Sequence, residues 1–568
     1  MGKITMARPA VAAQKTEKLT YGKARKLKQL LTKGQKFLKE GNDAEAAKYI
    51  VEAWNMNPED FDLLVATADV MARLGVRAKA LEVLERALAI HGPKPDVISV
   101  LGNLSIELEM HEVMEKLFRI YVDLRPNDPM GYNNIASALE KQDKYDDAIV
   151  FLKDVIPLFP ENPALWNTLG SCVAARDGYK DAIPFYSEAY RLAPKSYNIL
   201  NNISIAFEQS GEYEEALRFG REAVAVSPDI AHAHMGLATS HLALGQLAEG
   251  WREYEWRQDP RRKGSLFYTH GLPRWDGGPL DGKYLMVCPE QGLGDEILFA
   301  LSYPQLIKET AGLAIGCDRR LVGLFERSFP GCRAGAYVDG FHDAYRYRSM
   351  PTLQGLNGGE KVPADLYIEC GSVPLYRWHT VADLPDYPDG FLVPDPALLN
   401  KWRQRLASLG DRPKIGIYWR SGLQAGIRKK QYAPIEAWEP VFKAAPNADF
   451  INLQYGDTAA ERALVKEKLG VTIHHWDDTD LKGDLEAVSA LSKAVDLAIG
   501  PASAPGMFSF AVGTPTWWLL PVRPWWCFGN PDRPPFFSKG RLLVGPVDDP
   551  WATLMPRLAA ELATYLGN

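Results

Sequence analysis

A 34-residue period organises the first half of the chain and limits what it can fold into. Rows of 34 residues starting at Leu27 align without a gap over 27–260. Small residues let two antiparallel helices approach closely, and a proline ends the second helix of a pair. Prolines recur near position 32, and position 20 is small in most rows. The residues at position 8 are Gly34, Ala68, Gly102, Ala136, Gly170, Ser204 and Ala238. The period therefore predicts an all-α superhelix of six to seven helix-turn-helix units.

The clearest row, "ALWNTLGSCVAARDGYKDAIPFYSEAYRLAP" (164–194), resembles the tetratricopeptide repeat (TPR). In such a solenoid the first helix of each repeat lines a concave face. Asparagine amides on that face can pair with both the N–H and the C=O of an extended peptide. The alternative is that these asparagines are solvated or cap local turns. The candidates for a client-peptide groove are Asn133, Asn134, Asn167, Asn201 and Asn202.

The chain outside the repeats divides by composition. Residues 1–26 form a basic N-terminal extension, and the Gly/Pro-rich segment 261–282 is expected to be a linker. The aromatic stretch "EGWREYEWR" (249–257) is expected to cap the solenoid and seal it onto the second half of the chain.

Composition excludes several classes of function. A net charge of −6 gives no field that favours nucleic acid, and no apolar stretch approaches the length of a membrane span. Six widely spaced cysteines without a C-x-x-C pair argue against a zinc module or a disulfide framework. We therefore expect no metal, no cofactor and a cytoplasmic location.

The second half shows short apolar runs that alternate with amphipathic helical segments. This pattern predicts parallel sheets with crossover helices. Two sets of runs indicate two Rossmann-like domains, 283–390 and 391–568, with ligands bound at the carboxyl ends of the strands. The predicted strands are 283–288, 313–317 and 366–370 in the first set, and 414–419, 449–454, 471–476, 495–500, 515–521 and 541–545 in the second.

Several polar groups come directly after these predicted strands. Asp295, in "PEQGLGDEILFA", is either a general base or a complement to the dipole of the helix that it begins. Basic groups at strand ends can hold a diphosphate or the single phosphate of a CMP-sugar. A solvated charge cluster is the alternative for 428–430. The candidates from the second set are Arg420, Lys429, Lys430 and Gln454.

The loop "GPASAPGMFSF" (500–510) comes after the predicted strand 495–500 and opens a helix. Ser503, Ala504 and Gly506 are placed to present backbone N–H groups and one hydroxyl to a phosphate, aided by the helix dipole. A plain structural turn is the alternative.

With these residues in place, 283–568 resembles the bacterial heptosyltransferase-type glycosyltransferases, especially forms carrying tetratricopeptide repeats. The resemblance rests on "EQGLGDEILFA", "SVP" (372–374), "KIGIYWRSG", "NLQYGD", "DLEAVSALSKAVDLAIG" and "GTPTWWLLP", in this order. It implies a metal-independent GT-B fold with the donor held mainly by the C-terminal domain. It also implies that Asp295 is the base and that Arg420, Lys429 or Lys430 and the 500–507 loop bind phosphate.

Repeat solenoids joined to such a transferase are similar to bacterial flagellin glycosyltransferases. This resemblance implies an inverting protein O-glycosyltransferase whose solenoid recruits flagellin, with a nonulosonic acid such as pseudaminic acid transferred from CMP. The family often has Asp-Thr, and His four residues later, where this chain has Ala502-Ser503 and Met507. That departure fits either a different donor, with a CMP-sugar favoured and a nucleotide-diphosphate sugar as the alternative, or a reduced activity. The alternatives are an adaptor or export chaperone with an inactive transferase fold, and a transferase acting on lipopolysaccharide or another glycan.

Overall fold

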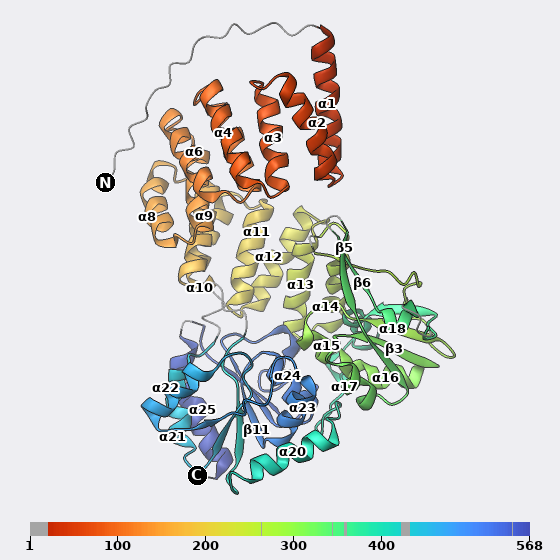
Figure 1. Ribbon diagram of the computed structural model, residues 1–568. Helices are drawn as coiled ribbons and strands as arrows, with labels where there is room; N and C mark the ends of the chain where they lie inside the picture. The colour runs from red at the N-terminus through yellow and green to blue at the C-terminus, as the bar shows by residue number, and fades with distance from the viewer. Residues whose placement is uncertain are drawn as a thin grey trace. The chain divides into compact units, whose positions relative to one another are not determined.

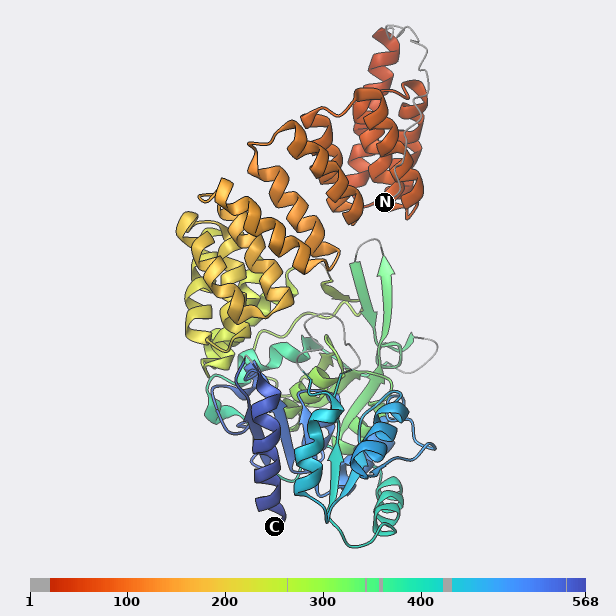
Figure 2. The same cartoon turned by 90° about the vertical axis from the view of Figure 1, so that its left-hand side faces the viewer.

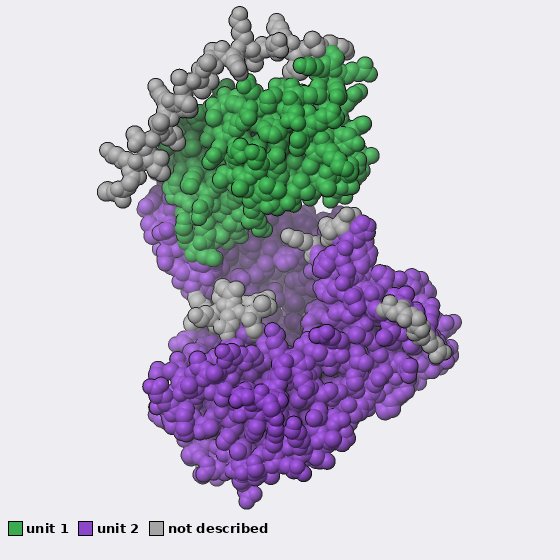
Figure 3. All heavy atoms as spheres, in the orientation of Figure 1, with its two compact units in different colours: residues 1–144 green, residues 145–568 purple. Residues whose placement is uncertain are grey.

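The computed structural model describes residues 21–262, 264–342, 345–356, 361–421, 432–547 and 549–567 (Figure 1). The chain divides into two compact units, Met1–Lys144 and Tyr145–Asn568 (Figure 3). No helix among the described residues is both long enough and apolar enough to span a bilayer.

The first unit holds the early helix pairs of the solenoid, and the later pairs open the second unit. Unit one contains α1 (Tyr21–Lys39), α2 (Asp43–Met56), α3 (Phe61–Arg73), α4 (Arg77–His91), α5 (Pro95–Glu107), α6 (His111–Leu124) and α7 (Pro129–Lys141). Unit two continues with α8 (Tyr145–Val155), α9 (Pro163–Arg176), α10 (Tyr179–Leu192), α11 (Tyr197–Gln209), α12 (Tyr213–Val226), α13 (Ala231–Ala243) and α14 (Leu247–Tyr254).

The structure confirms the repeat and its register. From α3 to α13, the first helix of each pair begins at residue 61, 95, 129, 163, 197 or 231, which is every 34 residues. Close packing explains the small residues at position 8: a Cβ on Gly102 would lie 2.6 Å from the Phe118 ring, and one on Gly170 2.7 Å from the Tyr186 ring.

The second unit contains two parallel sheets, as the sequence predicts. The first has the order β4-β3-β2-β7, with β2 (Tyr284–Cys288), β3 (Gly312–Cys317), β4 (Cys332–Ala336) and β7 (Leu366–Glu369). Its helices are α15 (Leu293–Phe299), α16 (Tyr303–Glu309), α17 (Val322–Ser328) and α19 (Val373–Arg377).

The second sheet has the order β10-β9-β8-β11-β12-β13, in which chain order reverses between β8 and β11, as in a Rossmann-type sheet. Its strands are β8 (Lys414–Ile417), β9 (Asp449–Asn452), β10 (Ile473–His474), β11 (Leu497–Pro501), β12 (Thr516–Leu520) and β13 (Gly540–Val544). Its helices are α20 (Pro396–Ala407), α21 (Glu439–Ala444), α22 (Ala459–Leu469), α23 (Leu485–Ala494), α24 (Ala504–Ala511) and α25 (Pro550–Leu566).

Helices cover both faces of the second sheet (Figure 2). Ile415 and Ile417 of β8 belong to the core formed with α21 and α25, whereas Tyr418 belongs to the core with α20 and α23. The alternation results from the period of two along a strand.

The segment 261–282, expected to be a linker, is packed against the first sheet. It contains β1 (Leu266–Tyr268), which pairs with β6 (Tyr345–Ser349). Strand β6 also pairs with β5 (Val338–His342), and α18 (Pro351–Gln354) follows β6 in the chain. Trp275 and Leu280 of this segment are buried. The aromatic cap also packs as expected: buried Trp251 lies 6.1 Å from Trp378, ring centroid to ring centroid.

Candidate functional site

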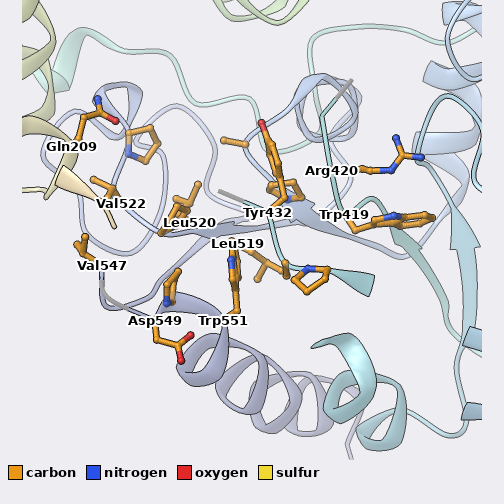
Figure 4. A pocket seen from close by; sticks show the side chains of 18 of the residues that line it. Gln209, Trp419, Arg420, Tyr432, Leu519, Leu520, Val522, Val547, Asp549 and Trp551 are labelled. Atoms are coloured by element: carbon orange, nitrogen blue, oxygen red, sulfur yellow. The ribbon is translucent and has the colours of Figure 1, made fainter. Parts of the chain in front are cut away.

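A cavity of about 1040 Å³ lies within the second unit, where the carboxyl edge of the second sheet meets the solenoid. Figure 4 shows side chains from both sources around it. The solenoid contributes Asp177, Gly178, Tyr179, Glu208, Gln209 and Tyr213. The sheet side contributes, among others, Trp419, Arg420, Pro501, Ala502, Leu519, Leu520, Val522, Arg523, Trp525, Asp549 and Trp551.

The strand order explains why the cavity forms there. The chain order reverses between β8 and β11, so the loops after these strands diverge and leave a crevice at their carboxyl ends. Arg420 lies just after β8, and Ala502 just after β11. The cavity therefore occupies the position where sheets of this kind bind ligands.

Arg420 is held at the cavity wall by a carboxylate. Its Nε lies 2.8 Å from Glu461 Oε1, and one terminal nitrogen donates to the carbonyl oxygen of Asp457 at 2.6 Å. The hydrogen bond that Arg420 donates to Glu461 raises the pKa of the guanidinium above its ordinary value. The site thus contains the predicted phosphate-binding arginine in a fixed position.

Gln454, which the sequence predicts to bind phosphate, hydrogen-bonds to the backbone of its own chain. It is fully buried, and its side-chain oxygen accepts the backbone N–H groups of Trp419 at 3.0 Å and Arg420 at 2.9 Å. Its amide nitrogen donates to the carbonyl oxygen of Tyr455 at 3.1 Å. Gln454 therefore fixes the backbone that carries Arg420. The predicted Lys429 and Lys430 lie outside the described residues.

The predicted amide cradle begins next to the cavity, whose lining includes Ala502 but not Ser503, Ala504 or Gly506. The Gly506 N–H donates to the Ser503 carbonyl oxygen at 3.1 Å, so it is used within α24. A Cβ on Gly506 would lie 2.4 Å from Tyr418 Oη. Close packing of α24 on the sheet therefore accounts for this glycine, and the phosphate role of the loop stays a prediction.

Asp295 lies in the first turn of α15, which packs against α24 from the other sheet. It is half-buried and does not line the cavity. Burial raises the pKa of its carboxyl to about 6, opposed by a backbone hydrogen bond from Gly292 and reinforced by the nearby charge of Glu290. The neighbouring Glu296 is buried and accepts the Asp318 N–H at 2.9 Å, a structural role.

The sequence did not predict the cavity-lining residues that the solenoid contributes. Burial raises the pKa of the Glu208 carboxyl to about 7. The Tyr213 hydroxyl donates to the carbonyl oxygen of Arg523. The Arg523 Nε is buried without a hydrogen-bond partner in the described part of the chain. Arg523 comes after the predicted strand 515–521, so its position at a strand end was the available signal.

The asparagines lie on the first helices of their repeats, as predicted. Within the second unit, Asn202 Nδ2 of α11 donates to Asn167 Oδ1 of α9 at 3.0 Å. Asn201 lines a smaller groove of about 190 Å³ between α11, α12 and α13. Asn133 and Asn134, on α7 of the first unit, are half-buried.

The stacked helix pairs and the two parallel sheets define a tetratricopeptide-repeat protein with a C-terminal region of parallel sheets. A family model for the tetratricopeptide repeat matches residues 133–197 and 201–254. Protein FlbA of Caulobacter vibrioides is 35% identical over 506 residues, covering 87% of this chain and 83% of FlbA. The chain therefore belongs to the family of FlbA.

Solved structures match part of the chain. A tetratricopeptide repeat protein from Parabacteroides merdae is 13% identical, with a TM-score of 0.32, over 42% of this chain and 94% of its own. MamA from residue 41 to its end, from Desulfovibrio magneticus, is 19% identical with a TM-score of 0.25, over 30% of this chain and 97% of its own.

Proposed function

We propose that the protein is a glycosyltransferase of the GT-B type that modifies Ser or Thr of a protein client held by the solenoid. The cavity of about 1040 Å³ at the strand-order reversal of the second sheet carries this proposal, because its volume is that of a small-molecule site and the solenoid forms the opposite wall. The sequence resemblance to flagellin glycosyltransferases supports flagellin as the client.

A CMP-linked nonulosonic acid such as pseudaminic acid is the donor we favour. Its single phosphate needs fewer cations than a diphosphate. Of the described residues, Arg420 and Arg523 are the arginines of the cavity lining, and Glu461 already neutralises Arg420. Donor specificity then depends on Arg523 and on the loop after β11.

The reaction is an inverting transfer. The acceptor hydroxyl oxygen bonds to the anomeric carbon, the bond from that carbon to the phosphate oxygen breaks, and CMP leaves with the bonding electrons. The acceptor proton passes to a carboxylate, for which we propose Asp295 from the sequence resemblance; it lies outside the cavity lining, on α15, which packs against α24. Its pKa of about 6 leaves it ionised near neutral pH and more basic than an ordinary aspartate.

The test combines purified protein, flagellin encoded in the same genome and CMP-pseudaminic acid. We expect intact-mass spectrometry to show flagellin gaining whole sugar masses. Asp295→Asn should lower the transfer rate at least about 100-fold, the scale of general-base catalysis. Asp281→Asn changes an exposed aspartate just before β2 and is the matched control.

Flagellin that binds to the wild-type protein without gaining mass from any CMP- or nucleotide-diphosphate sugar would favour the adaptor alternative. Transfer to a free glycan after removal of the repeats would favour the glycan-modifying alternative. Full transfer by Asp295→Asn would disprove only the assignment of the base.

A further inference from the structure

The cavity and the groove on the solenoid share one residue. The groove, of about 190 Å³, is lined by α11, α12 and α13, and Glu208 of α11 lines both it and the cavity. Glu208 therefore lies at the border between the two spaces. All of these residues belong to the second unit.

The groove has the size and lining of a peptide path. Asn201 and Glu208 are seven residues apart on α11, which is about 10 Å along the helix axis. That length matches about three residues of an extended chain. Small residues line the groove, and a Cβ on one of them, Gly236, would meet no atom within 4 Å, which leaves room for a backbone.

The polar groups at the junction suit a hydroxyl-bearing peptide. Thr239 of α13 lines the groove with Glu208, and Tyr179 and Tyr213 line the cavity with it. On the sheet side, the carbonyl oxygen of Arg523 accepts a hydrogen bond from the Tyr213 hydroxyl. A carboxylate in this position can accept a hydrogen bond from a peptide N–H or from a Ser or Thr hydroxyl.

We infer that the solenoid forms the acceptor wall of the transfer site: an extended client segment lies in the groove from Asn201 to Glu208, and Glu208 binds it where the hydroxyl enters the cavity. This inference rests on the proposed function. The repeats then form one wall of the transfer site and also recruit the client. The modified Ser or Thr then lies about three residues along the client from the position that contacts Asn201.

Kinetics with flagellin and CMP-pseudaminic acid test the acceptor wall. We expect Glu208→Ala to raise the KM for flagellin about tenfold or more, because a charge-assisted hydrogen bond to the client is lost. Glu212→Gln is the matched control, since Glu212 is exposed, lies in the same repeat and lines neither space. Equal KM values for the two variants would overturn the inference.

A measurement independent of turnover separates this inference from the proposed function. A photo-cross-linking phenylalanine analogue replaces Ile205, which lines the groove, or Glu214, which is exposed on α12. We expect flagellin to cross-link at position 205 and not at 214. The reverse pattern, or cross-linking at neither site, overturns the acceptor wall even if wild-type transfer occurs. Cross-linking at 205 without transfer supports it as a binding site and contradicts the proposed enzyme.

Discussion

The two parallel sheets of the second unit begin with the same strand order, yet their carboxyl edges are occupied differently. At the first sheet, Glu290 after β2 binds Arg257, and Glu369 of β7 binds Arg274. Arg257 comes just after α14 and Arg274 from the 261–282 segment, so side chains of the protein fill and neutralise this edge. At the second sheet the corresponding edge borders a cavity of about 1040 Å³.

The difference shows that topology alone does not define a ligand site. Strand order places a crevice at both carboxyl edges. In the first sheet the crevice holds the end of the solenoid, and the buried Glu290 and Glu369 have arginine partners there, although one oxygen of the buried Glu296 has no hydrogen-bond partner in the described chain. In the second sheet Arg523 lines the cavity with its Nε unpaired within the described residues. We call the carboxyl edge of the first sheet the docking edge, because arginine–carboxylate pairs join it to the chain after the solenoid. We call that of the second sheet the binding edge, because Arg523 Nε has no partner there among the described residues.

The largest expected effect comes from breaking the docking edge. Arg257 is 4% exposed, and its Nε and a terminal nitrogen bind the two oxygens of Glu290 at 2.7 and 2.9 Å. Arg257→Met leaves Glu290 buried without its partner, which should lower the free energy of unfolding by about 3–5 kcal/mol. Urea unfolding followed by tryptophan fluorescence measures the change.

The control for this change is Arg191→Ala, which removes an exposed ion pair with Glu188 and should cost at most about 1 kcal/mol. If both variants lose the same stability, the buried network does not hold the solenoid end to the first sheet.

The next effect in size concerns the binding edge. Arg523→Gln should weaken CMP binding about tenfold, because the cavity loses a cation that has no carboxylate partner in the described chain. Isothermal titration calorimetry with CMP measures the dissociation constant. Arg533→Gln, in the same segment but outside the cavity lining, should bind CMP as the wild type does. An unchanged affinity in Arg523→Gln places the phosphate elsewhere.

The sequence predicted the solenoid register and most of the parallel strands, because both depend on local repetition of residue size and hydrophobicity. It missed β4, whose sequence "CRAGA" lacks large aliphatic residues, and β5 and β6, which pair as a partly polar antiparallel ribbon. These strands are stabilised by neighbours distant in sequence rather than by their own pattern.

The candidate site was predicted only on its sheet side. Arg420 lies after a strong strand signal, so its position at a carboxyl edge could be inferred. Glu208 and Tyr213 lie in ordinary repeats, more than 200 residues before the strands that they face, and nothing local distinguishes them. Gln454 was read as a ligand-binding group because its strand end is apparent in sequence, whereas its backbone partners are visible only in the structure.

The smallest expected effect tests Asp295, an acid at the first edge whose pKa is raised to about 6. Its ordinary pKa is about 4, so the folded state binds the proton more tightly than the unfolded state does. Stability therefore falls as pH rises from about 4 to about 6 and stays lower above that range. Asp295→Asn lacks this loss and should be more stable than the wild type at pH 8, by on the order of 1 kcal/mol, with the advantage fading towards pH 4.

Urea midpoints of both proteins at pH 4.5, 6 and 8 measure this difference, with Asp281→Asn expected to match the wild type throughout. A less stable Asp295→Asn at pH 8 would show that the Gly292 hydrogen bond outweighs burial and that the aspartate serves the fold. A more stable variant that has lost transfer would show the opposite. Asp295 would then be a carboxylate that costs the fold stability, and because such a cost gives the fold nothing, catalysis is the reason to keep it.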